Sequence, residues 1–232
     1  MISAFTHILR LARAGYVFAR EGVFGFADPS AMPPQAQFAV RMARLIDDLL
    51  SLSRVELSAH VRPEKLVDVV PLIRLVVDGL EPLASERQVT IELGLPPSPV
   101  MIAGDTEELL RVFENLIENG LKYGASGGRV IVSLTEPDAD DAAGELRVAV
   151  RDYGPGIPPE HLPRLTERFY RVDVGDSRAQ GGTGLGLSLV KHILNRHRGR
   201  LVIESVSGQG ATFTVCFPAT RTAGAETVAV KE

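Results

Sequence analysis

The sequence predicts an α+β protein in which an α/β sandwich follows a helical N-terminal part. Apolar residues recur at helical spacing between Phe38 and Ser58. After about Val61, two kinds of segment follow one another along the chain. In one kind apolar and polar residues alternate, as in a strand, and in the other apolar residues recur at helical spacing. The last two alternating segments, separated by glycines, are typical of a hairpin that closes a sheet. With 232 residues, the chain can form one domain of ordinary size plus a helical attachment.

The N-terminal part is expected to contain two helices. Residues 1–25 predict an amphipathic cationic helix, which packs on a partner helix or lies on an anionic membrane surface. The proline-rich segment 27–37 predicts a break. The helix at 38–58 is too apolar on one face to stand alone, which implies a partner helix or a homodimer.

The sandwich is expected to extend from 61 to 218, followed by a disordered tail at 219–232. A short strand precedes a helix that begins near Pro71, and a second helix has Asp105 as its N-cap, Glu108 in the capping-box position and Gly124 as its stop. A third helix ends near His197. The remaining strands are expected within 89–96, 100–105, 128–136, 145–154 and 200–218.

Composition excludes several classes of protein. The net charge of -4 argues against a nucleic-acid-binding surface. The single cysteine, Cys216, rules out an internal disulfide framework, fits a reducing compartment, and is expected to be a buried, inert thiol. No run of about 18 apolar residues predicts a membrane span. We therefore expect a cytoplasmic protein, with residues 1–25 as a peripheral membrane contact at most.

The segment Gly181–Ile193, GGTGLGLSLVKHI, predicts a backbone that approaches a phosphate chain. Glycines allow N–H groups to turn toward an anion, and the helix that follows adds positive potential. It is not a P-loop, and its third glycine is misplaced for a dinucleotide fingerprint. A tight helix entry without a ligand remains the alternative.

Two further patterns carry oxygen and nitrogen groups suited to a nucleotide. Asn115 and Asn119 share a helical face with Lys122, so neutral oxygens for Mg²⁺ lie beside a charge for phosphate; an exposed amide face is the alternative. Asp152 ends a strand and can accept a hydrogen bond from an exocyclic amine, although an ordinary Asp-Gly-Pro turn is the simpler interpretation.

Four segments in this order resemble the N, G1, F and G2 boxes of sensor histidine kinases: NLIENGLKYG, DYGPGIP, ERFYRVD and GGTGLGLSLVKHI. The resemblance covers Phe38 to Pro218 and is greatest to the phosphate-regulon type. It implies a Bergerat (GHKL) ATP-binding domain behind a dimerisation helix, a homodimer through 38–58, and a response-regulator receiver domain as partner. Implied cofactors are ATP and Mg²⁺.

The resemblance also implies roles for individual residues. Asn115 and Asn119 would hold Mg²⁺, Lys122 and Arg171 would act on phosphates, and Asp152 would bind the adenine amine. Residues 170–180 would form the ATP lid. The other residues expected around the nucleotide are Tyr123, Gly154, Gly156, Tyr170, Gly182, Thr183, Gly184, Leu185, Gly186 and Leu187.

The H box of the family, which carries the phosphoacceptor histidine, is not recognisable. Only His7 precedes the dimerisation helix; in THILRLA, Ile8 replaces the family's acidic residue. The remaining histidines are expected at the surface or at helix ends: His60, His161, His192 and His197. His7 is either the acceptor or an ordinary residue of the cationic helix face, which is the simpler interpretation and would place the acceptor in another chain. A histidine kinase is one expectation. A nucleotide-binding module that transfers nothing is its rival, and a gyrase-like conformational ATPase is a third reading that the F box disfavours.

Overall fold

The computed structural model describes residues 34–58, 60–137, 144–172 and 182–218, which form two compact units. One unit holds α2 (Pro34–Leu57) and the described part of Arg164–Leu189. The other holds the described parts of Ala59–Pro163 and of the chain from Val190 on. The expected helix at 1–25, His7, most of the expected lid and the tail after Pro218 lie outside the described residues.

In the first unit, α2 begins at Pro34, earlier than the expected Phe38. The prediction of a break up to residue 37 is wrong here, because proline is tolerated in the first helical turn. Leu52 and Val55, three residues apart, are buried. Phe38 and Leu49, by contrast, are exposed, so α2 keeps apolar surface uncovered by the described residues.

The second unit contains a five-stranded sheet in the order β2-β4-β5-β7-β6, with β2 and β6 at its ends. Strand β2 runs parallel to β4, and the other neighbours are antiparallel. β1 and β3 form a separate antiparallel pair. The strands are β1 (Leu66–Asp68), β2 (Thr90–Gly94), β3 (Met101–Ala103), β4 (Arg129–Thr135), β5 (Glu145–Asp152), β6 (Arg200–Ser205) and β7 (Ala211–Pro218).

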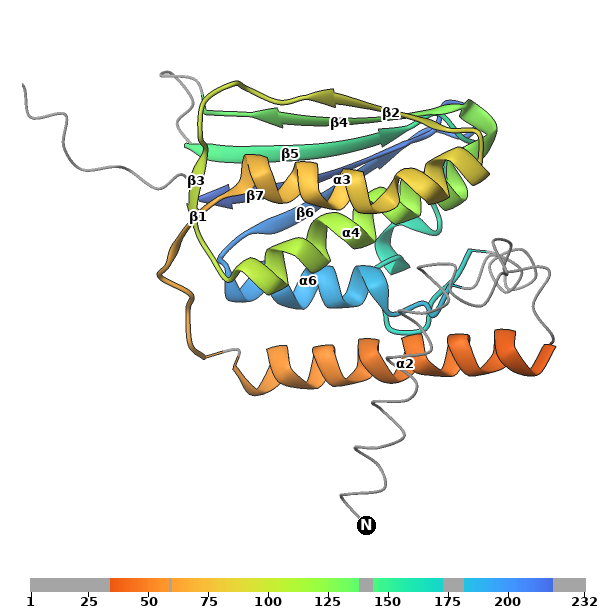
Figure 1. Ribbon diagram of the computed structural model, residues 1–232, viewed down its shortest axis with the longest axis horizontal. Coiled ribbons are helices and arrows are strands. Elements are labelled where there is room, and N and C mark those ends of the chain that lie inside the picture. Colours follow the sequence, from red (N-terminus) through yellow and green to blue (C-terminus); the bar gives the residue numbers. More distant parts are fainter. Residues whose placement is uncertain (1–33, 59, 138–143, 173–181, 219–232) are drawn as a thin grey trace, which may run out of the picture. The chain divides into compact units, whose positions relative to one another are not determined.

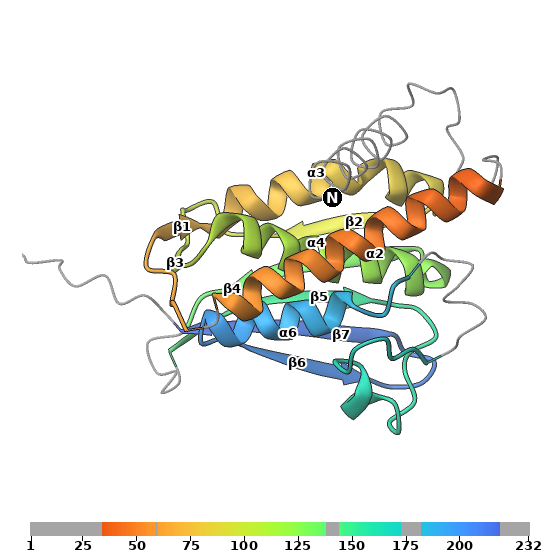
Figure 2. The same cartoon turned by 90° about the horizontal axis from the view of Figure 1, so that it is seen from below.

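Helices α3 (Val69–Glu86) and α4 (Thr106–Tyr123) cover one face of this sheet, as Figures 1 and 2 show from two directions. The C-terminal part of α6 (Gly186–Arg196) lies on the same face. Two 3-10 turns complete the described elements, η2 (Ala125–Gly127) and η3 (Leu162–Arg164).

The core lies between the helices and the inner face of the sheet. Burial alternates along β4 and β5, as their sequence pattern predicts. Helix α4 packs tightly against the sheet at Gly120, where an added Cβ would meet both methyl groups of Val130 at 3.3 Å. Cys216 is buried as expected, and burial raises the pKa of its thiol.

Helix α3 begins at Val69, two residues before the expected Pro71. Its N-cap is Asp68, whose side chain accepts hydrogen bonds from the backbone N–H groups of Val70, at 3.1 Å, and Val100, at 3.0 Å. A carboxylate that accepts from the first backbone N–H groups fixes the start of a helix at the residue that follows it. The same carboxylate ties this start to the residue before β3.

No helix among the residues described combines the length and the apolar character that a membrane span requires.

Candidate functional site

Asp152 at the end of β5 is a buried carboxylate held by backbone N–H groups. Its Oδ1 accepts from Gly154 at 2.9 Å and from Ala211 at 3.3 Å. Both bonds fall on one oxygen, so Oδ2 is the atom that an amine donor can address. Burial raises the pKa of Asp152, and the two N–H groups oppose that rise. The bond to Gly154, two residues on, is that of an Asx turn, as the simpler interpretation expects, and the bond to Ala211 joins this turn to β7.

Glycines surround Asp152 because backbone passes too close for any side chain. A Cβ on Gly124 would lie 2.3 Å from the Cβ of Asp152, and one on Gly210 would lie 2.1 Å from its carbonyl oxygen. A Cβ on Gly154 would meet the Cα of Gly124 at 2.7 Å, and one on Gly156 the carbonyl oxygen of Val206 at 2.2 Å. Gly154 and Gly156, expected to make room for a base, are thus also required by the protein's own backbone.

Helix α4 brings the second group of predicted residues to this end of the unit, since its C-cap is Gly124. Asn115 and Asn119 are half-buried on one face, which disfavours an exposed amide face. The Asn115 amide nitrogen donates to the Arg111 carbonyl at 2.8 Å, so the side-chain oxygen is the group left to serve a cation. An oxygen donor of this kind fits Mg²⁺.

Lys122, at the end of the same helix face, is 9% exposed and forms an ion pair with Glu118 at 2.8 Å. Sequence reasoning missed Glu118 as its partner, although the spacing i,i+4 is the signal for such a pair. An incoming phosphate would compete with this carboxylate for the ammonium group. Tyr123 follows and is exposed.

In the first unit, the residues around Phe169 (the Phe169 segment, 164–172) and residues 182–187 (the glycine segment) are joined by backbone contacts. The Phe169 N–H donates to the Gly184 carbonyl at 2.8 Å. Both residues have positive φ, 63° for Phe169 and 74° for Gly184, and a Cβ on Gly184 would lie 2.9 Å from the Phe169 Cα. A phenylalanine in this conformation is strained, and such residues gather at functional sites.

The other predicted residues of this unit lie in the same two segments. The Arg164 guanidinium lies over the Tyr170 ring, 4.2 Å from the ring centroid, in a cation–π contact. Thr183 donates its hydroxyl hydrogen to Asp48 of α2, and the Leu185 N–H donates to the Thr183 oxygen. Leu185 is buried, and the half-buried residues are Tyr170, Arg171, Gly182, Thr183, Gly184, Gly186 and Leu187.

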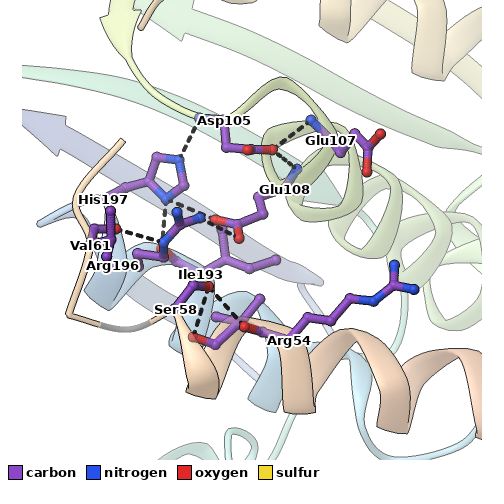
Figure 3. Close-up of polar contacts among 10 residues, drawn as sticks. Arg54, Ser58, Val61, Asp105, Glu107, Glu108, Ile193, Arg196 and His197 are labelled. Atoms are coloured by element: carbon purple, nitrogen blue, oxygen red, sulfur yellow. Dashed lines mark hydrogen bonds and ion pairs between the residues drawn. The ribbon is translucent and has the colours of Figure 1, made fainter. Parts of the chain in front are cut away.

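A cluster that sequence reasoning missed connects the start of α4 with the end of α6 (Figure 3). Glu108 was expected to close a capping box on the Asp105 N–H. That prediction is wrong: the Asp105 N–H donates to His197 Nε2 at 3.0 Å, and Glu108 pairs with Arg196 at 2.5 Å. Arg196 also donates to the Val61 carbonyl at 2.9 Å. The cluster therefore ties residue 61 to both helices.

His197 directly follows α6, a helix-end position as expected, but its side chain is buried and not at the surface. Its Nδ1–H donates to the Ile193 carbonyl at 2.8 Å while Nε2 accepts from Asp105, an arrangement that requires the neutral ring. Burial is the main cause that lowers its pKa. The Glu108 Oε2 atom lies 3.7 Å from Nδ1 and, among the described residues, has no hydrogen-bond partner.

Comparisons with known proteins agree with this architecture. The family model for histidine kinase-, DNA gyrase B-, and HSP90-like ATPases matches residues 104–221. The phosphate regulon sensor protein PhoR of Pseudomonas aeruginosa is 41% identical over 87% of this chain and 44% of its own length. For the sensor histidine kinase WalK of Bacillus subtilis the identity is 34%, over 77% of this chain and 28% of that protein.

Solved structures give the same fold. The mycobacterial sensor histidine kinase MprB matches with a TM-score of 0.57 and 28% identity, over 67% of this chain and 97% of that one. Acinetobacter baumannii AdeS, at 22% identity, shares the fold with a TM-score of 0.63 over 92% of this chain and 98% of its own. The predicted fold class, a Bergerat-type α/β sandwich behind a helical segment, is confirmed.

This chain spans less than half the length of PhoR and WalK. The family model nevertheless covers half of it, across α4, the Asp152 turn, the glycine segment and the closing hairpin. The chain belongs to the histidine kinase-, DNA gyrase B- and HSP90-like ATPases, and its core is that of a sensor histidine kinase of the kind that phosphate-regulon sensors represent.

Proposed function

We propose that the chain is an ATP-dependent protein-histidine kinase of a two-component system. The observation that carries the proposal is the buried Asp152 carboxylate, with one oxygen held by backbone and the other open to an amine, next to the end of the helix that presents Asn115 and Asn119. A carboxylate in this position selects a base with an exocyclic amine, as in adenine. Family membership supports ATP as the nucleotide.

The chain's own residues divide the work of binding. Asp152 accepts the adenine amine, and Tyr123 borders the base. The oxygens of Asn115 and Asn119 hold Mg²⁺, which when bound neutralises phosphate charge. Lys122 and Arg171 contribute positive charge to the phosphates, and the N–H groups of residues 182–187 line the triphosphate at the start of α6.

The reaction breaks the bond between the γ-phosphorus and its bridging oxygen, and forms a bond from that phosphorus to a neutral imidazole nitrogen; ADP leaves. The phosphoryl group then passes to an aspartate of a response-regulator receiver domain. The protein's contribution is positioning and charge stabilisation. The acceptor is His7 or a histidine of another chain.

Exposed apolar residues of α2, such as Phe38 and Leu49, support assembly as a homodimer through that helix.

Transfer of label from γ-labelled ATP with Mg²⁺ tests the proposal, with the native chain and His7→Ala compared side by side. Acid-labile, alkali-stable label that disappears in His7→Ala would identify a self-sufficient kinase. Label that survives would move the acceptor to another histidine. Binding of ATP without any label, also when a partner chain with an intact H box is added, would refute the kinase and leave a nucleotide-binding module.

A further inference from the structure

The carboxylate of Asp48 on α2 contacts the glycine segment, a contact that the proposed function does not use. Thr183 Oγ1 donates to Asp48 Oδ2 at 2.7 Å, and the Leu185 N–H donates to Thr183 Oγ1 at 3.3 Å. A threonine hydroxyl has one hydrogen to give. In this arrangement Thr183 gives it to α2.

A second carboxylate of α2 acts on the neighbouring segment. Glu56, about two turns beyond Asp48, forms an ion pair with Arg168. Arg168 precedes Phe169, whose N–H is bonded to Gly184. Helix α2 thus reaches both segments that the proposed function assigns to the phosphates, and the two segments are bonded to each other.

These contacts cannot coexist unchanged with a bound triphosphate. The Thr183 hydroxyl can donate to Asp48 or to a phosphate oxygen, but not to both. A carboxylate within hydrogen-bond distance of Thr183 also repels an anion that approaches the same atom. Asp48 is half-buried, so solvent screens this repulsion only in part.

We propose that Asp48 is an autoinhibitory residue: it clasps the glycine segment to α2 through Thr183 and thereby opposes binding of Mg-ATP. The inference rests on the proposed function, because it concerns the phosphate part of the same site. Coupling of this kind is reciprocal, so bound nucleotide weakens the hold of α2 on the segment to the same degree. A displacement of α2 would accordingly change nucleotide affinity.

The direct test measures the dissociation constant of a non-hydrolysable Mg-ATP analogue for the full chain by calorimetry. Asp48→Asn keeps the shape and removes the charge, and it is expected to bind about three- to tenfold more tightly, from the worth of a charge-assisted hydrogen bond reduced for partial exposure. Asp47→Asn removes the same charge one residue away, at an exposed position, and is expected to change affinity less than twofold.

A double-mutant cycle separates the clasp from a general effect of charge. In a Thr183→Val background, Asp48→Asn should change affinity clearly less than in the native background, because the partner hydroxyl is gone and only the repulsion by the Asp48 charge remains. In a Thr183→Ser background, which restores the hydroxyl, the effect should return. An equal effect in the valine and native backgrounds, or equal effects of Asp48→Asn and Asp47→Asn, would overturn the proposal.

Hydrogen exchange provides a readout that does not depend on nucleotide. In the native chain without ligand, the Leu185 amide should exchange several-fold more slowly than in Asp48→Ala, because alanine removes the acceptor of the Thr183 hydroxyl and Thr183 is in turn the acceptor of this amide. Equal exchange would contradict the clasp even if affinities differed. Failure of the native chain and every variant to bind the analogue would instead overturn the proposed function and this inference with it.

Discussion

Arg196→Met is expected to lower the free energy of unfolding of the second unit by about 3 kcal/mol, because it leaves Glu108 buried without its cation. The two side chains are 11% and 15% exposed and 2.5 Å apart. Breaking one side of a buried ion pair costs about 3–5 kcal/mol, and the residual exposure places this pair at the lower end. The lost hydrogen bond to the Val61 carbonyl adds at most about 1 kcal/mol.

The double variant Arg196→Met, Glu108→Leu should recover most of that loss, since apolar residues of similar volume replace a buried pair at little cost. Urea unfolding followed by far-UV circular dichroism supplies the four corners of the cycle. Glu167→Gln, which breaks the exposed pair with Arg164, is the control and should cost about 0.5 kcal/mol or less. If Arg196→Met costs no more than the control, or if the two changes simply add, the assignment of an uncompensated charge at Glu108 is wrong.

Three further predictions follow from the second unit. His197 is neutral in the fold and its pKa is lowered, so below about pH 6.5 the folded chain binds fewer protons than the unfolded chain. The free energy of unfolding should therefore fall as pH drops below that value. Unfolding free energies at two pH values should show this fall for the native chain and not for His197→Gln. Asp152→Asn should weaken ATP binding at least about tenfold in a calorimetric titration, yet retain the thermal midpoint, because it removes a buried charge. Gly124→Ala should cost about 1–3 kcal/mol by urea unfolding, whereas Gly94→Ala, with ordinary contacts at 3.5 Å, should change little; equal costs would contradict the tight approach at Gly124.

Local chemistry explains what the sequence could predict. Helix α4 has its N-cap, Asp105, and its stop, Gly124, within one continuous segment, and both were predicted correctly. Asp152 and the asparagine face likewise follow from short patterns. The alternation along β4 and β5 identifies both strands and the face of each that is buried, because the period of a strand is two residues.

Contacts between distant segments explain what the sequence could not predict. Glu108 occupies a capping-box position, yet the Asp105 N–H finds its acceptor in His197, 92 residues away. No local pattern distinguishes that histidine from the other helix-end histidines. Gly210 offers no sign of its closeness to Asp152 either, since the approach arises only when β7 pairs with β5. The geometry of a site thus depends on pairings that short motifs do not encode.

The two ends of the five-stranded sheet bear on how this protein behaves at high concentration. Strand β2 has only five residues, and among the described strands it pairs with β4 alone, so its other edge can offer N–H and C=O groups to an extended chain that approaches. Glu92 lies exposed at its centre, where a charge discourages such pairing. Replacement of this one carboxylate by valine would make TIELG a continuous β-prone segment, and the main effect would be fibrous self-association instead of a change in fold or activity.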